Sequence, residues 1–222
     1  MEQFREFLMR AAHDLRSPVR SLRTGAELLQ SPEKRNGPEL EQILSFMMEG
    51  ARKLDSLVDG LSNLAVAMSS KQSGFRPTRI DVVLRSAIAR LRDPIRESGA
   101  EVRYGDLPTV TGDPDRLTQL FENLLRNAIQ HRGDQPPVIE IQAEAGDGTW
   151  RFAVQDNGPG VEPEYLDRIF RPFERLTRTG PGSGLGLAIC REIVARHRGR
   201  IWAASQAGAG TTIYFTLPAD AG

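Results

Sequence analysis

One histidine and two runs of glycine are the residues of this 222-residue sequence whose types and spacing could do chemistry. His13 is followed directly by Asp14. A carboxylate beside an imidazole can hold one ring nitrogen and leave the other as a nucleophile. Glycines alternate with other residues in two short stretches, namely Gly158, Gly160, Gly182, Gly184 and Gly186. Backbone without side chains, next to a helix N-terminus, binds phosphate through free N–H groups.

A pair of asparagines adds a candidate metal ligand. Asn123 and Asn127 lie four residues apart in a helical pattern and therefore share one face. An amide oxygen is a suitable ligand for magnesium, which keeps most of its shell as water and phosphate oxygen. Taken singly, each feature has a plain alternative: a solvated histidine, flexible turns, or polar helix surface.

Charge and composition exclude several classes of function. Basic and acidic residues number 29 each, so no net charge draws the chain to nucleic acid or to an anionic membrane. Cys190 is the one cysteine, which excludes a disulfide framework and a cysteine zinc site and favours core packing for the thiol. No apolar stretch approaches the roughly 18 residues of a membrane span, and no signal peptide is recognised. We expect a cytoplasmic chain without membrane contact.

The first 69 residues follow the spacing of a helical hairpin. Leu8, Leu15, Leu22 and Leu29 recur every seven residues. After a turn at 31–38, a similar stripe covers 40–68 and includes Leu44, Ala51 and Val58. On this register His13 faces away from the apolar line. A lone hairpin leaves such a line in water, so we expect a homodimer that forms a four-helix bundle. The alternative is a hairpin that packs on the rest of the chain.

Residues after the polar linker 69–74 have a mixed pattern. We expect helices at 82–97, 114–131 and 185–197, with Asp113 as the N-cap of the second. Strands are expected at 100–104, 138–143, 150–155, 200–205 and 211–217. The pattern predicts an α/β two-layer sandwich with a largely antiparallel sheet, and domains at 1–70 and 76–219.

Six segments together resemble a known family. They are 12–18 (AHDLRSP), 123–128 (NLLRNA), 156–160 (DNGPG), 170–173 (FRPF), 182–187 (GSGLGL) and 208–211 (GAGT). These look like the H, N, G1, F, G2 and terminal glycine boxes of sensor histidine kinases, in the family's order. The resemblance implies a dimerisation and histidine-phosphotransfer domain followed by a Bergerat-type ATP-binding fold. Residues 127–141 are also similar to phytochrome-linked members.

The resemblance assigns a role to each matching residue. It makes His13 the phosphoacceptor and Asp14 the acceptor of a hydrogen bond from its ring. Asn127 matches the magnesium ligand, Asn123 a supporting polar residue, and Asp156 the carboxylate that binds the adenine amino group. The remaining nucleotide-binding positions that it implies are Gly158, Gly160, Arg175, Gly182, Gly184, Gly186 and Thr211. Residues 161–183 correspond to a lid in which Phe170 and Phe173 close over the nucleotide.

Two positions depart from the family pattern. Gln130 stands where the family usually has a phosphate-binding lysine, which predicts weakened ATP affinity. Ser17 stands where members that dephosphorylate their regulator have threonine or asparagine, which predicts feeble phosphatase activity.

The resemblance implies an ATP- and Mg²⁺-dependent protein-histidine kinase of a two-component system. His13 would be autophosphorylated, and an aspartate in the receiver domain of a response regulator would take the group. We expect the faces near 19–23 and the second helix to select that regulator. Two other readings stay open: a dimeric module that binds nucleotide but transfers nothing, and an ATP-driven clamp of the gyrase or Hsp90 sort.

Overall fold

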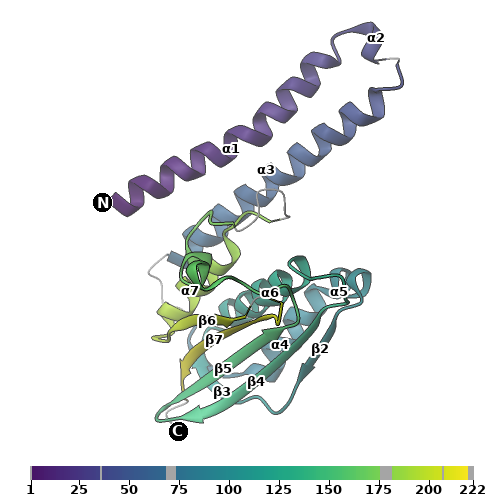
Figure 1. The fold of residues 1–222 in the computed structure, drawn as a ribbon. Coiled ribbons are helices and arrows are strands. Elements are labelled where there is room, and N and C mark those ends of the chain that lie inside the picture. Colours follow the sequence, from purple (N-terminus) through teal and green to yellow (C-terminus); the bar gives the residue numbers. More distant parts are fainter. Residues whose placement is uncertain (1, 36, 69–73, 176–181, 207, 220–222) are drawn as a thin grey trace. The chain divides into compact units, whose positions relative to one another are not determined.

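The computed structural model describes residues 2–35, 37–68, 74–175, 182–206 and 208–219 (Figure 1). The chain divides into two compact units, Met1–Asn63 and Leu64–Gly222. Of the expected linker 69–74, all but Gly74 lies outside the described residues. None of the described helices is long and apolar enough to cross a membrane.

The first unit is a helical hairpin, as the heptad pattern predicts. α1 (Glu2–Leu28) runs without interruption through Pro18, and α3 (Leu40–Met68) returns beside it. The last turn of α3, from Leu64, belongs to the second unit. The predicted turn contains a short helix, α2 (Pro32–Arg35), that the sequence analysis missed. Arg35 Nε donates to the backbone oxygen of Leu29 at 3.1 Å and helps to fix this turn.

Small residues bring the two helices of the hairpin together. On α1 the buried positions recur every seven residues at Ala11, Pro18 and Gly25. On α3 they recur in the same way at Ile43, Gly50 and Leu57. Each of these positions lies one residue before a position of the stripe predicted for this helix. The predicted stripe residues Leu44 and Val58 are 44% and 50% exposed. α3 therefore carries two apolar lines, and α1 covers one of them.

The second unit is built on a five-stranded sheet. Its strands are β2 (Glu101–Tyr104), β4 (Val138–Gly146), β5 (Thr149–Asp156), β6 (Ile201–Ser205) and β7 (Thr211–Pro218). Their order is β2-β4-β5-β7-β6; β2 and β4 are parallel and all other pairs antiparallel, so the expected largely antiparallel sheet is confirmed. A second antiparallel pair, β1 (Arg76–Arg79) with β3 (Thr109–Gly112), was not predicted.

Helices form the second layer, against one face of this sheet (Figure 1). They are α4 (Ile80–Arg90), α5 (Arg92–Ser98), α6 (Pro114–Gln130) and α7 (Gly186–Arg196), with 3-10 turns η1 (Pro163–Tyr165) and η2 (Arg168–Phe170) before α7. The single helix expected at 82–97 is in fact α4 and α5, separated at Leu91. Pro94 explains the break, because its ring would clash with the carbonyl of Arg90 in a continuous helix.

Aromatic rings join the helical layer to the sheet. Phe121 of α6 meets Phe215 edge-on at 5.8 Å, and Phe215 stacks on Phe152 at 4.8 Å. All three rings are fully buried. The N-cap predicted for α6 is confirmed, since Asp113 Oδ1 accepts from the backbone N–H groups of Asp115 and Arg116 at 3.0 and 3.2 Å. These contacts fix α6, which carries the two asparagines.

A buried histidine ties the end of α7 to the start of α6. His197 is 2% exposed. Its Nδ1 donates to the Ile193 oxygen at 2.7 Å, and its Nε2 accepts from the backbone N–H of Asp113 at 3.0 Å. Both nitrogens are thus used by the neutral ring, and a proton on Nε2 would break the second bond. Burial, and to a lesser extent Arg196, lowers the pKa of His197.

We expect the unfolding free energy of the second unit to fall as the pH is lowered from 7.5 to 5.5. In the unfolded chain His197 takes up a proton near its ordinary pKa of about 6.5, whereas the folded ring resists it. The single proton that His197 takes up on unfolding contributes at most about 1.4 kcal/mol per pH unit to this slope. Urea unfolding followed by tryptophan fluorescence measures this unit, because Trp150 and Trp202, the two tryptophans, lie in β5 and β6.

The control for this measurement is His197→Gln, whose side chain does not titrate. Its unfolding free energy should depend less steeply on pH than that of the wild type. His131, whose pKa is also lowered by burial and by Arg175, is present in both proteins and cancels in the comparison. Equal slopes in the two proteins would contradict the assignment to His197.

Candidate nucleotide-binding and phosphoacceptor sites

His13 lies on an open face of α1. Its side chain is 84% exposed, and Nδ1 lies 3.0 Å from Asp14 Oδ1. With an ionised carboxylate as acceptor, Nδ1 carries the proton and Nε2 keeps its lone pair. The exposure expected for His13 is found, and the ring presents one nitrogen to any group that approaches α1.

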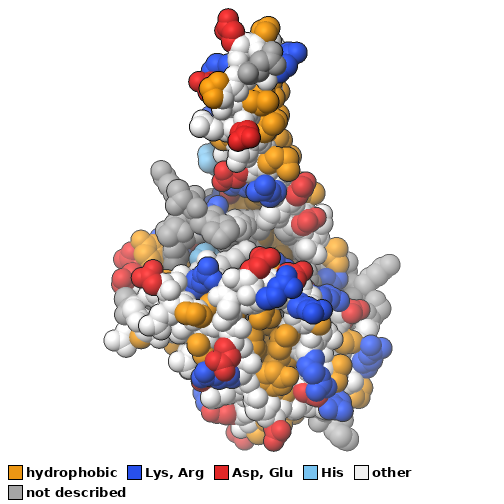
Figure 2. All heavy atoms as spheres, turned by 90° about the vertical axis from the view of Figure 1, so that its right-hand side faces the viewer, with side chains coloured by type: hydrophobic (Ala, Val, Ile, Leu, Met, Phe, Trp, Pro, Cys, Tyr) orange, Lys and Arg blue, Asp and Glu red, His pale blue; other side chains and the backbone are white. Residues whose placement is uncertain are grey.

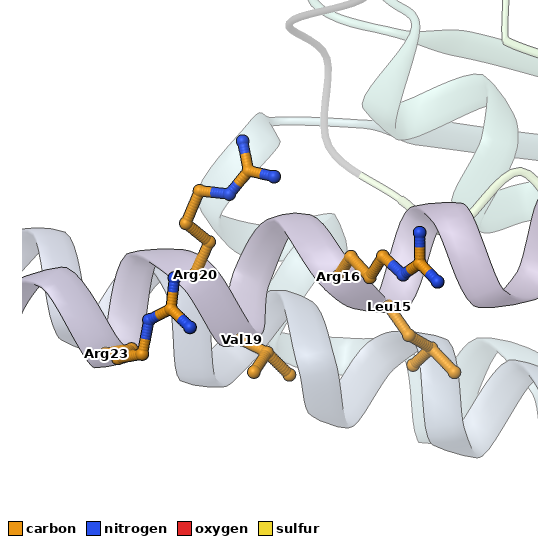
Figure 3. Close-up of a pocket in the computed structure, with 5 residues that line it drawn as sticks. All are labelled: Leu15, Arg16, Val19, Arg20 and Arg23. Atoms are coloured by element: carbon orange, nitrogen blue, oxygen red, sulfur yellow. The ribbon is translucent and has the colours of Figure 1, made fainter.

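Two shallow grooves flank His13 on the hairpin. One of about 420 Å³ is lined by His13, Arg16, Ser17, Arg20, Ser21, Thr24 and Phe46. The other, of about 320 Å³, is lined by Leu15, Arg16, Val19, Arg20 and Arg23 (Figure 3). Figure 3 shows the guanidinium groups of Arg16 and Arg20 extending to the side of α1 opposite Leu15 and Val19. Arg16 was not among the predicted site residues, although its spacing of four from Arg20 could have shown a shared face.

In the second unit, Asp156 lies at the end of β5 beside the start of β7. Its Oδ1 accepts from the backbone N–H groups of Gly158 at 2.9 Å and Thr211 at 3.2 Å. Burial raises the pKa of this carboxyl, and the two N–H groups act in the opposite direction. Asp156, Gly158 and Thr211, predicted as parts of one site, are therefore brought together.

The turns around Asp156 are fixed by close packing. A Cβ on Gly158 would lie 2.9 Å from both Asp156 Oδ1 and the His131 oxygen, and one on Gly210 would overlap the Asp156 oxygen. Ser205, which the sequence analysis missed, accepts from Val161 N–H and donates to the Gly210 oxygen, both at 2.7 Å. No motif marks this serine; its role comes from the pairing of β6 with β7.

The second glycine run leads into α7. Phe173 N–H donates to the Gly184 oxygen at 2.9 Å, and Phe170 and Phe173 are buried, at 5% and 8% exposure. α7 begins at Gly186, and its N-cap residue Leu185 makes no side-chain cap bond. The N–H groups of a first helical turn have no partner within the helix, and together with the positive end of the dipole they are suited to an anion. Arg175 borders this turn, since a Cβ on Gly184 would lie 3.1 Å from its Cγ. Residues 176–181 of the expected lid lie outside the described residues.

Two family descriptions match the chain. The model of the "His Kinase A (phospho-acceptor) domain" matches residues 4–67, and that of the "Histidine kinase-, DNA gyrase B-, and HSP90-like ATPase" matches residues 112–221. The chain belongs to the sensor histidine kinases. The two matches fall on the helical hairpin and on the α/β layers, so the expected fold class of this kinase core is confirmed.

Known proteins resemble nearly the whole kinase core. Cyanobacterial phytochrome A of Nostoc sp. strain PCC 7120 is 38% identical over 220 residues, which are 97% of this chain and 28% of the phytochrome. The chain thus spans less than a third of that relative. Histidine kinase ThkA in complex with response regulator protein TrrA has a TM-score of 0.76 at 25% identity, over 96% of this chain and 61% of that one. Full-length ShkA in complex with AMPPNP has a TM-score of 0.66 at 25% identity, over 96% and 45%.

The polar face of α6 in this kinase core is partly buried. Asn123 Nδ2 is buried and makes no hydrogen bond to any described residue. Its amide lies beside the fully buried Cys190, whose thiol pKa is raised by burial. Gln130, two turns further along α6, approaches the glycine run, because a Cβ on Gly182 would lie 3.3 Å from Gln130 Oε1. The structure therefore brings Gln130 to the glycine run, whereas His13 belongs to the other unit.

We expect Gly210→Ala to destabilise the second unit more than Gly208→Ala. Both glycines have positive φ, of 89° and 78°, so an alanine is strained at either position by about 1 kcal/mol. A Cβ at Gly208 meets open space, whereas one at Gly210 displaces the Asp156 backbone and adds about 1–3 kcal/mol. Urea unfolding followed by tryptophan fluorescence measures both costs. Equal losses in the two variants would contradict this packing argument.

Proposed function

We propose that this kinase core transfers the γ-phosphoryl group of ATP to His13 and then to an aspartate in the receiver domain of a response regulator. The observation that carries the proposal is the His13 ring, which is exposed and held through Nδ1 by Asp14 at 3.0 Å. We assign the first step to residues 1–70 and nucleotide binding to residues 76–219.

In the first step, Nε2 attacks the γ-phosphorus while the bond from that phosphorus to the bridging oxygen of ADP breaks. The ring becomes positively charged as the N–P bond forms, and the carboxylate of Asp14 stabilises this charge through the Nδ1 proton. Proton transfer to a base is not required before the attack, because Nε2 already has its lone pair. Transfer of this kind depends on positioning and charge neutralisation more than on a base of unusual pKa.

The second unit supplies groups for each part of the nucleotide. Asp156 Oδ1 is already used by two backbone N–H groups, which orient the carboxylate to accept from the adenine amino group. The first turn of α7, after Gly182 and Gly184, suits the phosphates because a helix N-terminus binds anions. Arg175 borders the same turn and is the cation that we assign to them. The ShkA neighbour was solved with AMPPNP, which supports a nucleotide at such a site.

Magnesium fits this site as an ion shared with the nucleotide. In the described residues no group of three or more His, Cys, Asp or Glu side chains could hold a metal by itself. Asn127 offers one neutral oxygen on the half-buried face of α6. A single protein oxygen with phosphate and water oxygens is the set that Mg²⁺ prefers. When bound, the ion would neutralise phosphate charge.

Two copies of the hairpin form a homodimer in this proposal. Figure 2 shows hydrophobic side chains along one side of the hairpin, and Leu44, Met48 and Val58 of α3 are 44–53% exposed. α1 already covers the neighbouring line of α3 through Ile43 and Gly50. An exposed apolar line of this length is a usual place for a second helix pair.

The grooves beside His13 are the surface that we assign to the regulator. The groove drawn in Figure 3 is lined by three arginines and by the apolar residues Leu15 and Val19; the arginines are Arg16, Arg20 and Arg23. A receiver domain takes the group on a carboxylate, and a basic groove with apolar sides suits an acidic surface around it. The ThkA neighbour was solved with a response regulator, which supports this class of partner.

Incubation with γ-labelled ATP and magnesium should label the wild type and leave His13→Gln unlabelled. The label should be acid-labile and alkali-stable, as expected for a phosphoryl group on nitrogen. Both proteins should bind ATP equally in a titration, because His13 lies outside the nucleotide-binding unit. ATP binding without label in the wild type would favour the interaction module instead.

Gln130→Lys should tighten ATP binding about fivefold. A lysine here would place a cation next to the glycine run that precedes α7, and a partly exposed charge pair contributes about 1 kcal/mol. Gln142→Lys adds the same charge at an exposed position of β4 and serves as the control. An unchanged dissociation constant for Gln130→Lys, or equal tightening in both variants, would contradict the prediction.

A further inference from the structure

The two ends of the Asn123 amide differ in their surroundings. Nδ2 is the one buried side-chain nitrogen or oxygen of the described residues that has no hydrogen-bond partner among them. Oδ1 of the same amide is not such an atom, and the residue as a whole is half-buried. The amide therefore lies with its nitrogen inward and its oxygen toward the surface. A buried N–H without a partner is costly, so its presence in α6 calls for a physical reason.

The thiol of Cys190 lies beside this amide. Cys190 is 0% exposed, and its Sγ donates to the Leu120 oxygen at 3.8 Å. Because the one thiol proton is used in this way, the lone pairs of the sulfur are the part that can interact with a further donor. Burial raises the pKa of the thiol and the Asn123 amide acts in the opposite direction, as an N–H group close to sulfur does.

The thiol and the amide meet next to the parts of the unit that we assign to the nucleotide. Cys190 follows Gly186 by four residues and so lies one turn from the start of α7, on the same face of that helix. On α6, Asn123, Asn127 and Gln130 follow spacings of four and three and share one face. Gln130 approaches the glycine run that precedes α7. The contact between the two helices at Cys190 thus lies behind the side chains that face the phosphates.

The orientation of the amide decides what Asn123 can bind. An amide oxygen accepts hydrogen bonds and suits cations, whereas an amide nitrogen donates. With Nδ2 inward, Asn123 presents an oxygen, which suits a water molecule in the shell of Mg²⁺ and repels phosphate oxygens. The opposite orientation would set two acceptors, Oδ1 and Sγ, against each other as long as the thiol proton stays on the Leu120 oxygen. The thiol therefore favours the orientation that serves the ion.

We propose that Cys190 is a positioning residue for the nucleotide site, whose sulfur accepts from Asn123 Nδ2 and keeps Oδ1 turned toward the bound ion. A small rotation of the amide closes this bond, and a bound nucleotide with its ion favours the rotation because it fixes Oδ1. The thiol then binds two groups of α6 from the facing helix, as donor to Leu120 and as acceptor from Asn123. This inference rests on the proposed function and adds to it a buried residue that acts through another side chain.

The test compares Cys190→Ser with Cys190→Ala in the full chain. The two side chains are nearly equal in volume, but the serine hydroxyl can still accept from Nδ2 and donate to Leu120. In a calorimetric titration with ATP and magnesium, the dissociation constant should stay within about twofold of the wild type in the serine variant and rise about fivefold in the alanine variant. In the latter, Nδ2 finds a partner only by turning outward to water, which withdraws Oδ1. Without magnesium the two variants should bind ATP equally.

Urea unfolding followed by tryptophan fluorescence separates this role from packing. A buried hydroxyl loses its hydration, so the serine variant should be no more stable than the alanine variant. If Cys190 only fills space, the affinities of the two variants for ATP with magnesium will be equal or will follow their stabilities, and either result would overturn the proposal. An equal loss of affinity with and without magnesium would contradict the assignment of Oδ1 to the ion.

The thiol itself reports the contact, because Cys190 is the one cysteine of the chain and gives a single S–H stretching band in the infrared. A bond accepted from Nδ2 polarises the thiol and strengthens its bond to the Leu120 oxygen. ATP with magnesium should therefore shift the band of the wild type to lower frequency and leave that of Asn123→Leu in place. A band that does not move in the wild type would overturn the proposal. If no protein binds ATP, the proposed function fails, and the band of the wild type against that of Asn123→Leu alone decides whether the thiol accepts from the amide.

Discussion

The first unit depends on how the residues of α1 are distributed around its helix axis. Successive residues of a helix are about 100° apart, so His13 lies roughly 200° around the helix from Ala11. Ala11, Pro18 and Gly25 are committed to α3, and this packing places His13 on the open side without any further device. The same geometry separates the grooves near Arg16 and Arg20 from the hairpin interior. One line of small residues thus decides both how the hairpin closes and which face of α1 the solvent reaches.

The second unit depends in a similar way on the pairing of β5 with β7. That pair brings the Thr211 N–H to the carboxylate of Asp156, since Gln155 lies opposite Thr212 in the antiparallel register. A slip by one residue would turn Asp156 to the other face of the sheet and lose the bond. Burial disfavours the charged carboxylate, and the two backbone N–H groups favour it. The orientation of this group therefore depends on the sheet register, through Thr211, as well as on the DNGPG turn, through Gly158.

The sequence predicted the parts of the fold that local chemistry controls. Asp113 before Pro114 correctly marks the start of α6, and the break at Leu91 could have been read from Pro94. The pairing of β1 with β3 joins segments more than 30 residues apart and leaves no local signal. For α3, periodicity finds the apolar residues but does not tell which line faces α1, because both lines recur every seven residues. The same holds for the candidate site. A local motif marks Asp156, whereas only the contacts in the folded structure reveal the role of Ser205.

α7 carries at one end the turn that we assign to the phosphates and at the other a residue that contacts the end of α3. Its 11 residues span about 16 Å, from the first turn at Gly186 to Arg196 beside the end of α3. A helix of this length, with five buried residues on its inner side, moves as one body. The same buried side chains therefore position both ends of the helix: the first turn that we assign to the phosphates, and the last turn, where Arg196 Nη1 donates to the Ala67 oxygen.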